Sequence, residues 1–203
     1  IITISREFGS GGRELGKRLA EELGIPCYDH QIIEMIAKEN GFDERYVANV
    51  SEKSIEAAYP MTIGHRFAMP SMEIMEQPIR VAAAQRQIIE NFAKQGDCVI
   101  IGRCADYALA EFPNVVSVFI TADEDVKIRT LMERHQISES QARDVMIKTD
   151  KKRASYYNYY SSKRWGDSKS YDLCINSSKT GADGAIKVIR EFARIKQEYA
   201  KIK

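Results

Sequence analysis

A glycine-rich turn near the start of the chain is the segment best suited to chemistry. Gly9-Ser10-Gly11-Gly12 follows the β-branched run at residues 1–5 and leads into a helical pattern. Glycines let several backbone N–H groups converge without interference from Cβ atoms, and the amino end of a helix carries partial positive charge. An anion is the natural occupant, so the turn predicts a cradle for nucleotide phosphates. The alternative is an α/β turn that binds no ligand.

The turn departs from the strict phosphate-loop motif G-x-x-x-x-G-K-[ST]. Aligned from the end of the strand, Arg6 stands at the first glycine, Gly12 at the lysine and Glu14 at the hydroxyl position. We expect Arg13 to supply the missing cation, the alternative being a solvated residue of the first helical turn. Glu14 could contact Mg²⁺ or simply pair with an arginine. The predicted cofactor-binding residues are Gly9, Ser10, Gly11, Gly12, Arg13 and Glu14.

Charged residues further along the chain could complete a phosphoryl-transfer site, which needs cations around the transferring oxygens. Arg103 follows the apolar run at 98–101, at the carboxyl end of an expected strand, where open α/β sheets bind their ligands. Asp150 and Arg153 are three residues apart, so the carboxylate could orient the guanidinium from one helical face. Both belong to segment 148–169, in which basic side chains outnumber acidic ones. A basic stretch of this kind is otherwise a solvated surface.

Strand and helix patterns alternate along most of the chain. Apolar or β-branched runs predict strands at 1–5, 27–29, 98–101, 115–120 and 171–176. Helical spacing predicts helices at 15–23, 30–39, 79–94, 123–135 and 182–199. Ser138-Glu139-Ser140-Gln141 has the form of a capping box that opens a further helix. The alternation predicts an α/β fold of three layers, with a central parallel sheet covered by helices on both faces.

Segment 42–78 interrupts this pattern. It is rich in methionine and punctuated by prolines, and we interpret it as a helical insertion within a single domain that spans 1–203. Methionine side chains adapt to irregular surfaces. The insertion therefore suits a mobile flap or a subunit contact, and a homodimer is one expectation.

Composition narrows the class of protein. The 203 residues carry 30 basic and 29 acidic side chains, a balance that gives no reason to expect nucleic acid or a membrane surface as a partner. No stretch of the sequence reaches the roughly 20 apolar residues needed to cross a bilayer. The four cysteines are scattered without a Cys-x-x-Cys pair, which favours free thiols in a reducing compartment. We therefore expect a cytoplasmic protein.

Five segments together resemble a known family. They are Ile-Thr-Ile-Ser-Arg-Glu-Phe-Gly-Ser-Gly-Gly-Arg-Glu at 2–14, Leu-Gly-Ile-Pro-Cys-Tyr-Asp at 23–29, Val-Ile-Ile-Gly-Arg at 99–103, Asp-Lys-Lys-Arg at 150–153 and Tyr-Asp-Leu-Cys-Ile-Asn at 171–176. Over nearly the whole chain, with 42–78 the weakest part, the sequence is similar to the cytidylate kinase-like proteins, relatives of bacterial cytidylate kinase. The resemblance implies a P-loop-type fold, ATP as phosphoryl donor with Mg²⁺, and a small acceptor.

The resemblance also implies residues on the acceptor side. Asp29 matches an aspartate that orients the acceptor and its metal in relatives, although a helix N-cap is the alternative. Arg103 matches the arginine of a Gly-Arg-Asp signature, with Cys104 in place of the aspartate and Asp106 two residues further on. Met35 stands where nucleotide kinases carry an arginine, which weakens the case for CMP as the acceptor.

The matched region 123–169 is expected to form a basic lid. The expected catalytic residues are Arg13, Asp29, Arg129 and Arg153. The expected acceptor-binding residues are Asp29, Arg103, Asp106, Arg134 and Asp150, and the candidate Mg²⁺ ligands are Glu14 and Asp29. We expect an ATP-dependent phosphotransferase acting on a small acceptor, with a nucleoside monophosphate such as CMP as one candidate. The alternative is a nucleotide-binding regulatory protein of the same fold with little or no kinase activity.

Overall fold

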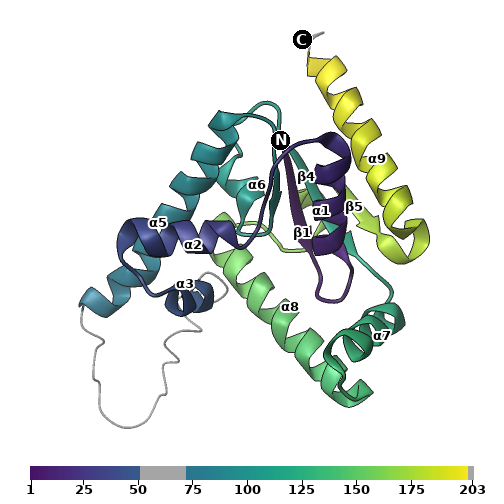
Figure 1. Cartoon of the computed structure of the whole chain (residues 1–203), viewed down its shortest axis with the longest axis horizontal. Coiled ribbons are helices and arrows are strands. Elements are labelled where there is room, and N and C mark those ends of the chain that lie inside the picture. Colours follow the sequence, from purple (N-terminus) through teal and green to yellow (C-terminus); the bar gives the residue numbers. More distant parts are fainter. Residues whose placement is uncertain (51–71, 201–203) are drawn as a thin grey trace.

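The computed structural model describes residues 1–50 and 72–200 (Figure 1). Five strands form one parallel sheet in the order β2-β3-β1-β4-β5. They are β1 (Ile2–Arg6), β2 (Cys27–Tyr28), β3 (Val99–Ile101), β4 (Val116–Thr121) and β5 (Leu173–Asn176). All five predicted strands are confirmed, with ends that differ by a few residues at most.

The helices of the described ranges connect these strands. They are α1 (Gly12–Leu23), α2 (Gln31–Asn40), α3 (Glu44–Val50), α5 (Met72–Gln95), α6 (Ala105–Ala108), α7 (Glu124–His135), α8 (Glu139–Ser161) and α9 (Ser177–Ala200), with a short 3₁₀ turn at Ser168–Ser170. Ser138 and Gln141 form the predicted capping box at the start of α8. The predicted start of α5 at residue 79 is wrong, because the helix runs through Pro78. An interior proline removes one backbone donor and crowds a preceding carbonyl, at a cost of about 3 kcal/mol, and α5 nevertheless continues through it.

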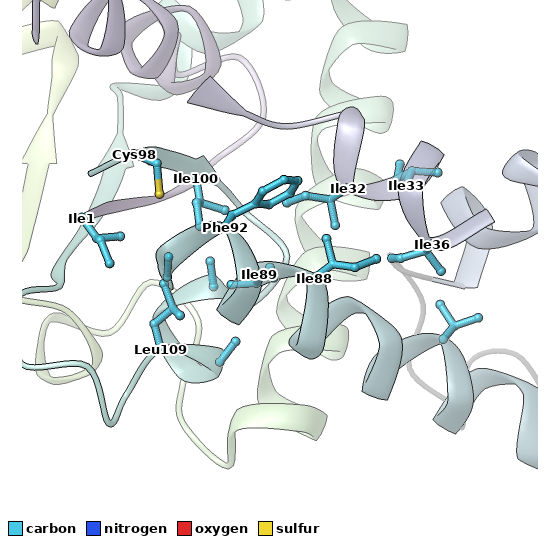
Figure 2. Close-up of a cluster of buried hydrophobic side chains, with 14 of the residues drawn as sticks. Ile1, Ile32, Ile33, Ile36, Ile88, Ile89, Phe92, Cys98, Ile100 and Leu109 are labelled. Atoms are coloured by element: carbon cyan, nitrogen blue, oxygen red, sulfur yellow. The ribbon is translucent and has the colours of Figure 1, made fainter. Parts of the chain in front are cut away.

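Apolar side chains pack on both faces of the sheet. On one face, α1 and α9 lie side by side (Figure 1) and cover Ile4 of β1, Ile101 of β3 and Ile120 of β4. On the other face, α2, α5 and α6 cover Ile100, and Figure 2 shows the isoleucines of α2 meeting those of α5 there. Successive residues of β3 thus point to opposite helical layers. This confirms the predicted three-layer α/β architecture.

The topology places the carboxyl ends of the strands at one edge of the sheet. From the central strand β1 the chain crosses to β2 on one side, whereas β3 leads to β4 on the other side. Ligands of open α/β sheets bind at such a reversal of strand order. The glycine-rich turn after β1 and the turn after β3 meet at this edge.

The predicted helical insertion lies only partly within the described residues. Of the predicted insertion 42–78, α3 and the beginning of α5 are described as helical, and the rest lies outside the described residues. The subunit contact expected there stays a prediction.

All four cysteines are free thiols. Across the described ranges, every helix is too short or too polar to span a bilayer.

Candidate functional site

The turn between β1 and α1 has the backbone conformation that its glycines allow. Gly9 (φ 85°) and Gly11 (φ 75°) are left-handed. A Cβ on Gly9 would lie 2.9 Å from the carbonyl oxygen of Lys127, so the turn packs directly against α7. A Cβ on Gly11 would meet no atom of the described residues within 4 Å, so among these residues the turn is open on that side. The segment therefore has room above it for a ligand.

Backbone amides of this turn are available to an anion. The first hydrogen bond of α1 joins the amide of Leu15 to the carbonyl of Gly11, and Gly11 provides no side-chain cap. In residues 1–50 and 72–200, no acceptor is within hydrogen-bond reach of the amides of Gly9, Gly11, Gly12, Arg13 and Glu14. These groups lie at the positive end of the helix. The predicted phosphate cradle fits a polyphosphate such as that of ATP.

Gly12 shows why the usual lysine is missing from the turn. A Cβ at this position would lie 2.7 Å from Cβ of Arg6 and 3.1 Å from Cβ of Ile120. The first separation is one that real Cβ atoms essentially never show, and the second is tighter than most of their contacts. With Arg6 in place, α1 therefore approaches β1 and β4 too closely for any residue but glycine at position 12.

Glu7 anchors the turn to the neighbouring elements. Its Oε2 accepts hydrogen bonds from Oγ1 of Thr121 (2.5 Å), Nζ of Lys127 (2.8 Å) and the amide of Ala122 (3.4 Å). Lys127 is buried, so its charge is balanced by Glu7. The sequence analysis missed both residues. A signal was present, because Lys127 lies one helical turn before the apolar Leu131 on the buried side of α7.

Helix α8 is fastened to the same turn. The amide of Phe8 donates to Oδ1 of Asp150 (2.7 Å), and Nη1 of Arg153 donates to the carbonyl of Arg6 (3.2 Å). Asp150 and Arg153 are 3.7 Å apart, as predicted from their spacing. Burial is the main reason that the pKa of Asp150 is raised to about 6, although the Phe8 amide and Arg153 act in the opposite direction. The basic region expected as a lid thus contacts the phosphate turn through these two residues.

Three predicted site residues pair with one another or with α7. Nε of Arg13 donates to Oδ2 of Asp29 at 2.5 Å. The N-cap of α2 is His30, without a side-chain hydrogen bond, so Asp29 is not the cap. Glu14 pairs with Arg134 at 3.1 Å, which agrees with the alternative that it contacts an arginine. Each candidate Mg²⁺ ligand is thus in an ion pair. In the described part of the chain, no group of three His, Cys, Asp or Glu side chains could hold a metal.

The turn after β3 is strained. Gly102, Arg103 and Cys104 are successive left-handed residues (φ 72°, 60° and 51°), a conformation that costs about 1–3 kcal/mol for each non-glycine residue and is concentrated at functional sites. The buried Gln85 of α5 holds this turn, because its Nε2 donates to the carbonyl of Arg103 (2.9 Å) and to the hydroxyl of Tyr156 (3.0 Å). Cys104 is buried among aromatic side chains, and burial raises the pKa of its thiol, which favours a packing role over that of a nucleophile.

A small cavity of about 40 Å³ lies between the two turns. Its lining includes three cationic and three aromatic side chains, namely Arg6, Arg103, Arg153, Tyr156, Tyr157 and Trp165. The structure thus brings the predicted Arg103 and Arg153 together. Arg6 joins them, although the sequence analysis gave it no role.

Other predicted residues lie away from this cavity. Asp106 is buried behind it, where its Oδ2 accepts a hydrogen bond from the Tyr157 hydroxyl at 2.6 Å, and burial raises its pKa. Arg129 is an exposed residue of α7, and no contact within the described residues joins it to the other candidates. Met35 is partly buried and packs against the core on the α2 side of the sheet.

Comparison with known proteins relates this geometry to a family. A cytidylate kinase from Methanococcus vannielii is 26% identical over 195 residues, which cover 94% of this chain and 98% of that protein. An uncharacterized protein from Eubacterium ventriosum has a crystal structure that is 32% identical, with a TM-score of 0.72 and coverage of 95% and 97%. A shikimate kinase from Bacteroides thetaiotaomicron has the same fold at 17% identity, with a TM-score of 0.54 and coverage of 95% and 97%.

The fold is therefore the three-layer P-loop fold, and the turn after β1 departs from the strict phosphate-loop motif. The family model described as "Cytidylate kinase-like family" matches residues 1–179. These residues include both turns, the cavity and the whole of the sheet. The chain belongs to the cytidylate kinase-like family.

Proposed function

We propose that the protein is an ATP-dependent phosphotransferase that moves the γ-phosphoryl group onto a small acceptor, with a nucleoside monophosphate such as CMP as the first candidate. One observation carries the proposal. An open glycine turn with unpaired amides lies beside an arginine-lined cavity at the same edge of the sheet. Membership of a kinase family supports the same activity.

In this proposal the two turns have separate tasks. The available amides of Gly9, Gly11, Gly12, Arg13 and Glu14 hold the donor phosphates, and Arg13 reaches them from the exposed side of α1. An oxygen of the acceptor attacks the γ-phosphorus while the bond to the bridging oxygen of ADP breaks. Arg103 and Arg153 neutralise charge on the transferred oxygens, and Asp150 holds Arg153 in place.

Mg²⁺ would bind chiefly to the phosphates and to water, as is usual for this ion. It neutralises phosphate charge when bound. Asp29 and Glu14 are both candidates to contact it, although each carboxylate is engaged by an arginine, Asp29 by Arg13 and Glu14 by Arg134. Asp29 is the better placed of the two, because it directly follows β2 at the carboxyl edge of the sheet, where open α/β sheets bind their ligands.

Calorimetry with Mg²⁺ and the ATP analogue AMP-PNP tests the donor site. The substitution Arg13→Ala should weaken binding by about tenfold, because a charge-assisted hydrogen bond to phosphate is worth about 1.5 kcal/mol or more. Arg18→Ala is the matched control, since Arg18 is an equally exposed arginine of the same helix that pairs with Asp183. Unchanged binding in Arg13→Ala would remove Arg13 from the donor site.

A coupled assay of ADP release tests the transfer itself. The acceptor panel contains the nucleoside monophosphates and small hydroxy acids, and ADP should form above the acceptor-free background with at least one of them. The second candidate function is a nucleotide-binding regulator. It is favoured by glycine at position 12 in place of the loop lysine and by the partly buried Met35 in place of the arginine of nucleotide kinases. Binding of AMP-PNP without ADP release for any acceptor would support the regulator and refute the kinase.

A further inference from the structure

Gln85 is a buried polar residue of α5 to which the proposed transfer gives no task. Only 3% of its surface is exposed. Its Nε2 donates to the carbonyl of Arg103 at 2.9 Å and to the hydroxyl of Tyr156 at 3.0 Å. Arg103 follows β3 and Tyr156 belongs to α8, so one side-chain amide joins three separate elements. It links the turn after β3 to the helix that contacts the glycine-rich turn.

The carbonyl that Gln85 holds belongs to the peptide group between two left-handed residues, Arg103 (φ 60°) and Cys104 (φ 51°). Non-glycine residues keep this conformation only where the surrounding structure fixes them. The neighbouring carbonyl of Gly102 is held within the turn itself, since it accepts from the amide of Ala105 at 3.1 Å. The Arg103 carbonyl has no backbone donor among the described residues, so its position depends on Gln85.

The bond to Arg103 also fixes which way the Gln85 amide is turned. A carbonyl oxygen only accepts hydrogen bonds, so the NH₂ group must face it. The amide oxygen Oε1 is then buried without a hydrogen-bond partner in the described part of the chain. A buried unpaired acceptor is unfavourable, and an apolar side chain of similar length, such as methionine, would avoid it. Packing alone therefore does not account for glutamine at this position, whereas the need to hold the Arg103 carbonyl does.

Holding this carbonyl keeps the Arg103 side chain in place. The position of the carbonyl sets ψ of Arg103, which together with φ defines the left-handed conformation. A relaxed peptide group would displace Arg103 relative to the small cavity that it lines with Arg153. A misplacement of about 1 Å, even when caused far from the reacting atoms, can slow a reaction about a hundredfold. A contact to the backbone of Arg103 can therefore control the chemistry of its side chain.

We propose that Gln85 is a positioning residue for phosphoryl transfer, which holds the strained backbone of Arg103 so that the guanidinium reaches the transferred oxygens. This inference rests on the proposed phosphotransferase function. Gln85 touches neither the donor nor the acceptor and acts through Arg103. Its loss lowers the rate of transfer and leaves the binding of ATP unchanged, because in the proposed function the glycine-rich turn and Arg13 hold the donor.

The test measures ADP release by the full chain with Mg²⁺, ATP and CMP, or, where CMP does not react, the acceptor of the panel that releases most ADP. Gln85→Met keeps the length of the side chain and removes the donor. Its kcat should fall at least tenfold, while KM for ATP should stay within about twofold. Gln87→Met is the matched control, since Gln87 is an exposed glutamine of the same helix, and it should change neither constant.

Two comparisons separate positioning from a general loss of packing. In a chain that also carries Arg103→Gln, the change Gln85→Met should have little further effect on kcat, because two residues that act through one group are not additive. Tyr156→Phe removes the other acceptor of Nε2 but leaves the bond to Arg103, so it should lower kcat by less than about threefold. Circular dichroism checks that each variant is folded.

Gln85→Glu tests the hydrogen bond itself, because it keeps the shape of the side chain. A protonated carboxyl group can donate to the Arg103 carbonyl, whereas a carboxylate can only accept. The kcat of Gln85→Glu, divided by that of wild type at the same pH, should therefore rise as the pH is lowered from 8.5 to 5.5. The same ratio for Gln85→Met should not change with pH.

The outcomes separate this inference from the proposed function. If wild-type protein releases no ADP with any acceptor, the kinase proposal fails and the role of Gln85 in transfer fails with it. If wild type is active and Gln85→Met has the same kcat, only the role of Gln85 is overturned. An equal fall in kcat with and without Arg103→Gln, or a loss in Tyr156→Phe as large as that in Gln85→Met, also overturns it. Should Gln85→Met not fold, a ratio for Gln85→Glu that is constant with pH refutes the positioning role.

Discussion

Replacing Asp150 by asparagine tests how the buried Asp150 carboxyl, which joins α8 to the glycine-rich turn, affects the stability of the protein. Burial, with a smaller contribution from the neighbouring Glu7, raises the pKa of this carboxyl from 3.8 to about 6, against the opposing effects of the Phe8 amide, Arg153 and Lys127. The folded protein therefore holds the proton more tightly than the unfolded chain. The stability that Asp150 contributes is fully present below about pH 4 and is lost as the pH rises through about 6.

The size of the effect follows from the shift. A change from 3.8 to about 6 is about two pKa units, or about 3 kcal/mol at 1.36 kcal/mol per unit. The side chain is only 17% exposed, so screening by solvent reduces this little. Asparagine keeps an oxygen that can accept from the Phe8 amide, which is 2.7 Å from Oδ1 in the wild type. Asp150→Asn should therefore be about 2–3 kcal/mol more stable than wild type above pH 7 and nearly equal to it below pH 4.

Urea denaturation of both proteins at intervals from pH 4 to pH 8.5 measures the difference directly. A gain of this size corresponds to a rise in Tm of roughly 5–10 °C for a chain of this length. Asp144→Asn is the control, because Asp144 is an exposed carboxylate of the same helix, and its effect should be small at every pH. A stability difference between Asp150→Asn and wild type that does not change with pH would refute the reasoning. In the transfer assay Asp150→Asn should be slower, since Arg153 loses its partner.

Three other substitutions test the packing around the site by urea denaturation at neutral pH. Gly12→Ala should destabilise the protein by about 1–3 kcal/mol, because the added methyl group meets Cβ of Arg6. The destabilisation should be smaller when Arg6 is changed to glycine in the same chain. Equal destabilisation in both backgrounds would contradict the packing argument. Glu7→Gln should cost about 3 kcal/mol by leaving the buried Lys127 without its carboxylate, so wild-type stability would show that Lys127 is not balanced by Glu7. Ser138→Ala should cost about 1 kcal/mol through loss of the cap on α8, and no loss would mean that the capping box contributes nothing.

The sequence was sufficient for the architecture because the relevant signals are local. Residues 98–101 form a continuous apolar run, and β3 is buried on both faces by opposite helical layers. Once such a strand is recognised, the residues that follow it must lie at the carboxyl edge of the sheet, and Arg103 lies there. The pairing of Asp150 with Arg153 was likewise predictable, since their spacing places both on one side of a helix.

The partners of the other charged residues depend on contacts between distant segments. Glu7 and Lys127 are separated by 120 residues, and nothing in either neighbourhood indicates that they meet. Asp29 could be interpreted as a helix cap because its local sequence permits one, but Arg13 reaches it across the first βα unit. The role of Gly12 depends on how closely α1 approaches Arg6 and Ile120. Such approach distances are set by tertiary packing and leave no periodic pattern in the sequence.

This chain has Arg6 where the phosphate-loop motif has its first glycine and Gly12 where the motif has its lysine. This reversal changes the interpretation of the missing lysine. Judged from the motif alone, Gly12 indicates a weakened donor site. In the structure the space of that lysine is taken by the Arg6 side chain, whose guanidinium reaches the cavity beside Arg103. The side chain at the end of β1 and the glycine at the start of α1 are therefore linked by packing, and the cation of this edge lies beside the turn that follows β3. In the proposed function, donor binding then depends on the backbone amides of the turn and on Arg13, so the missing lysine does not by itself argue against a donor site.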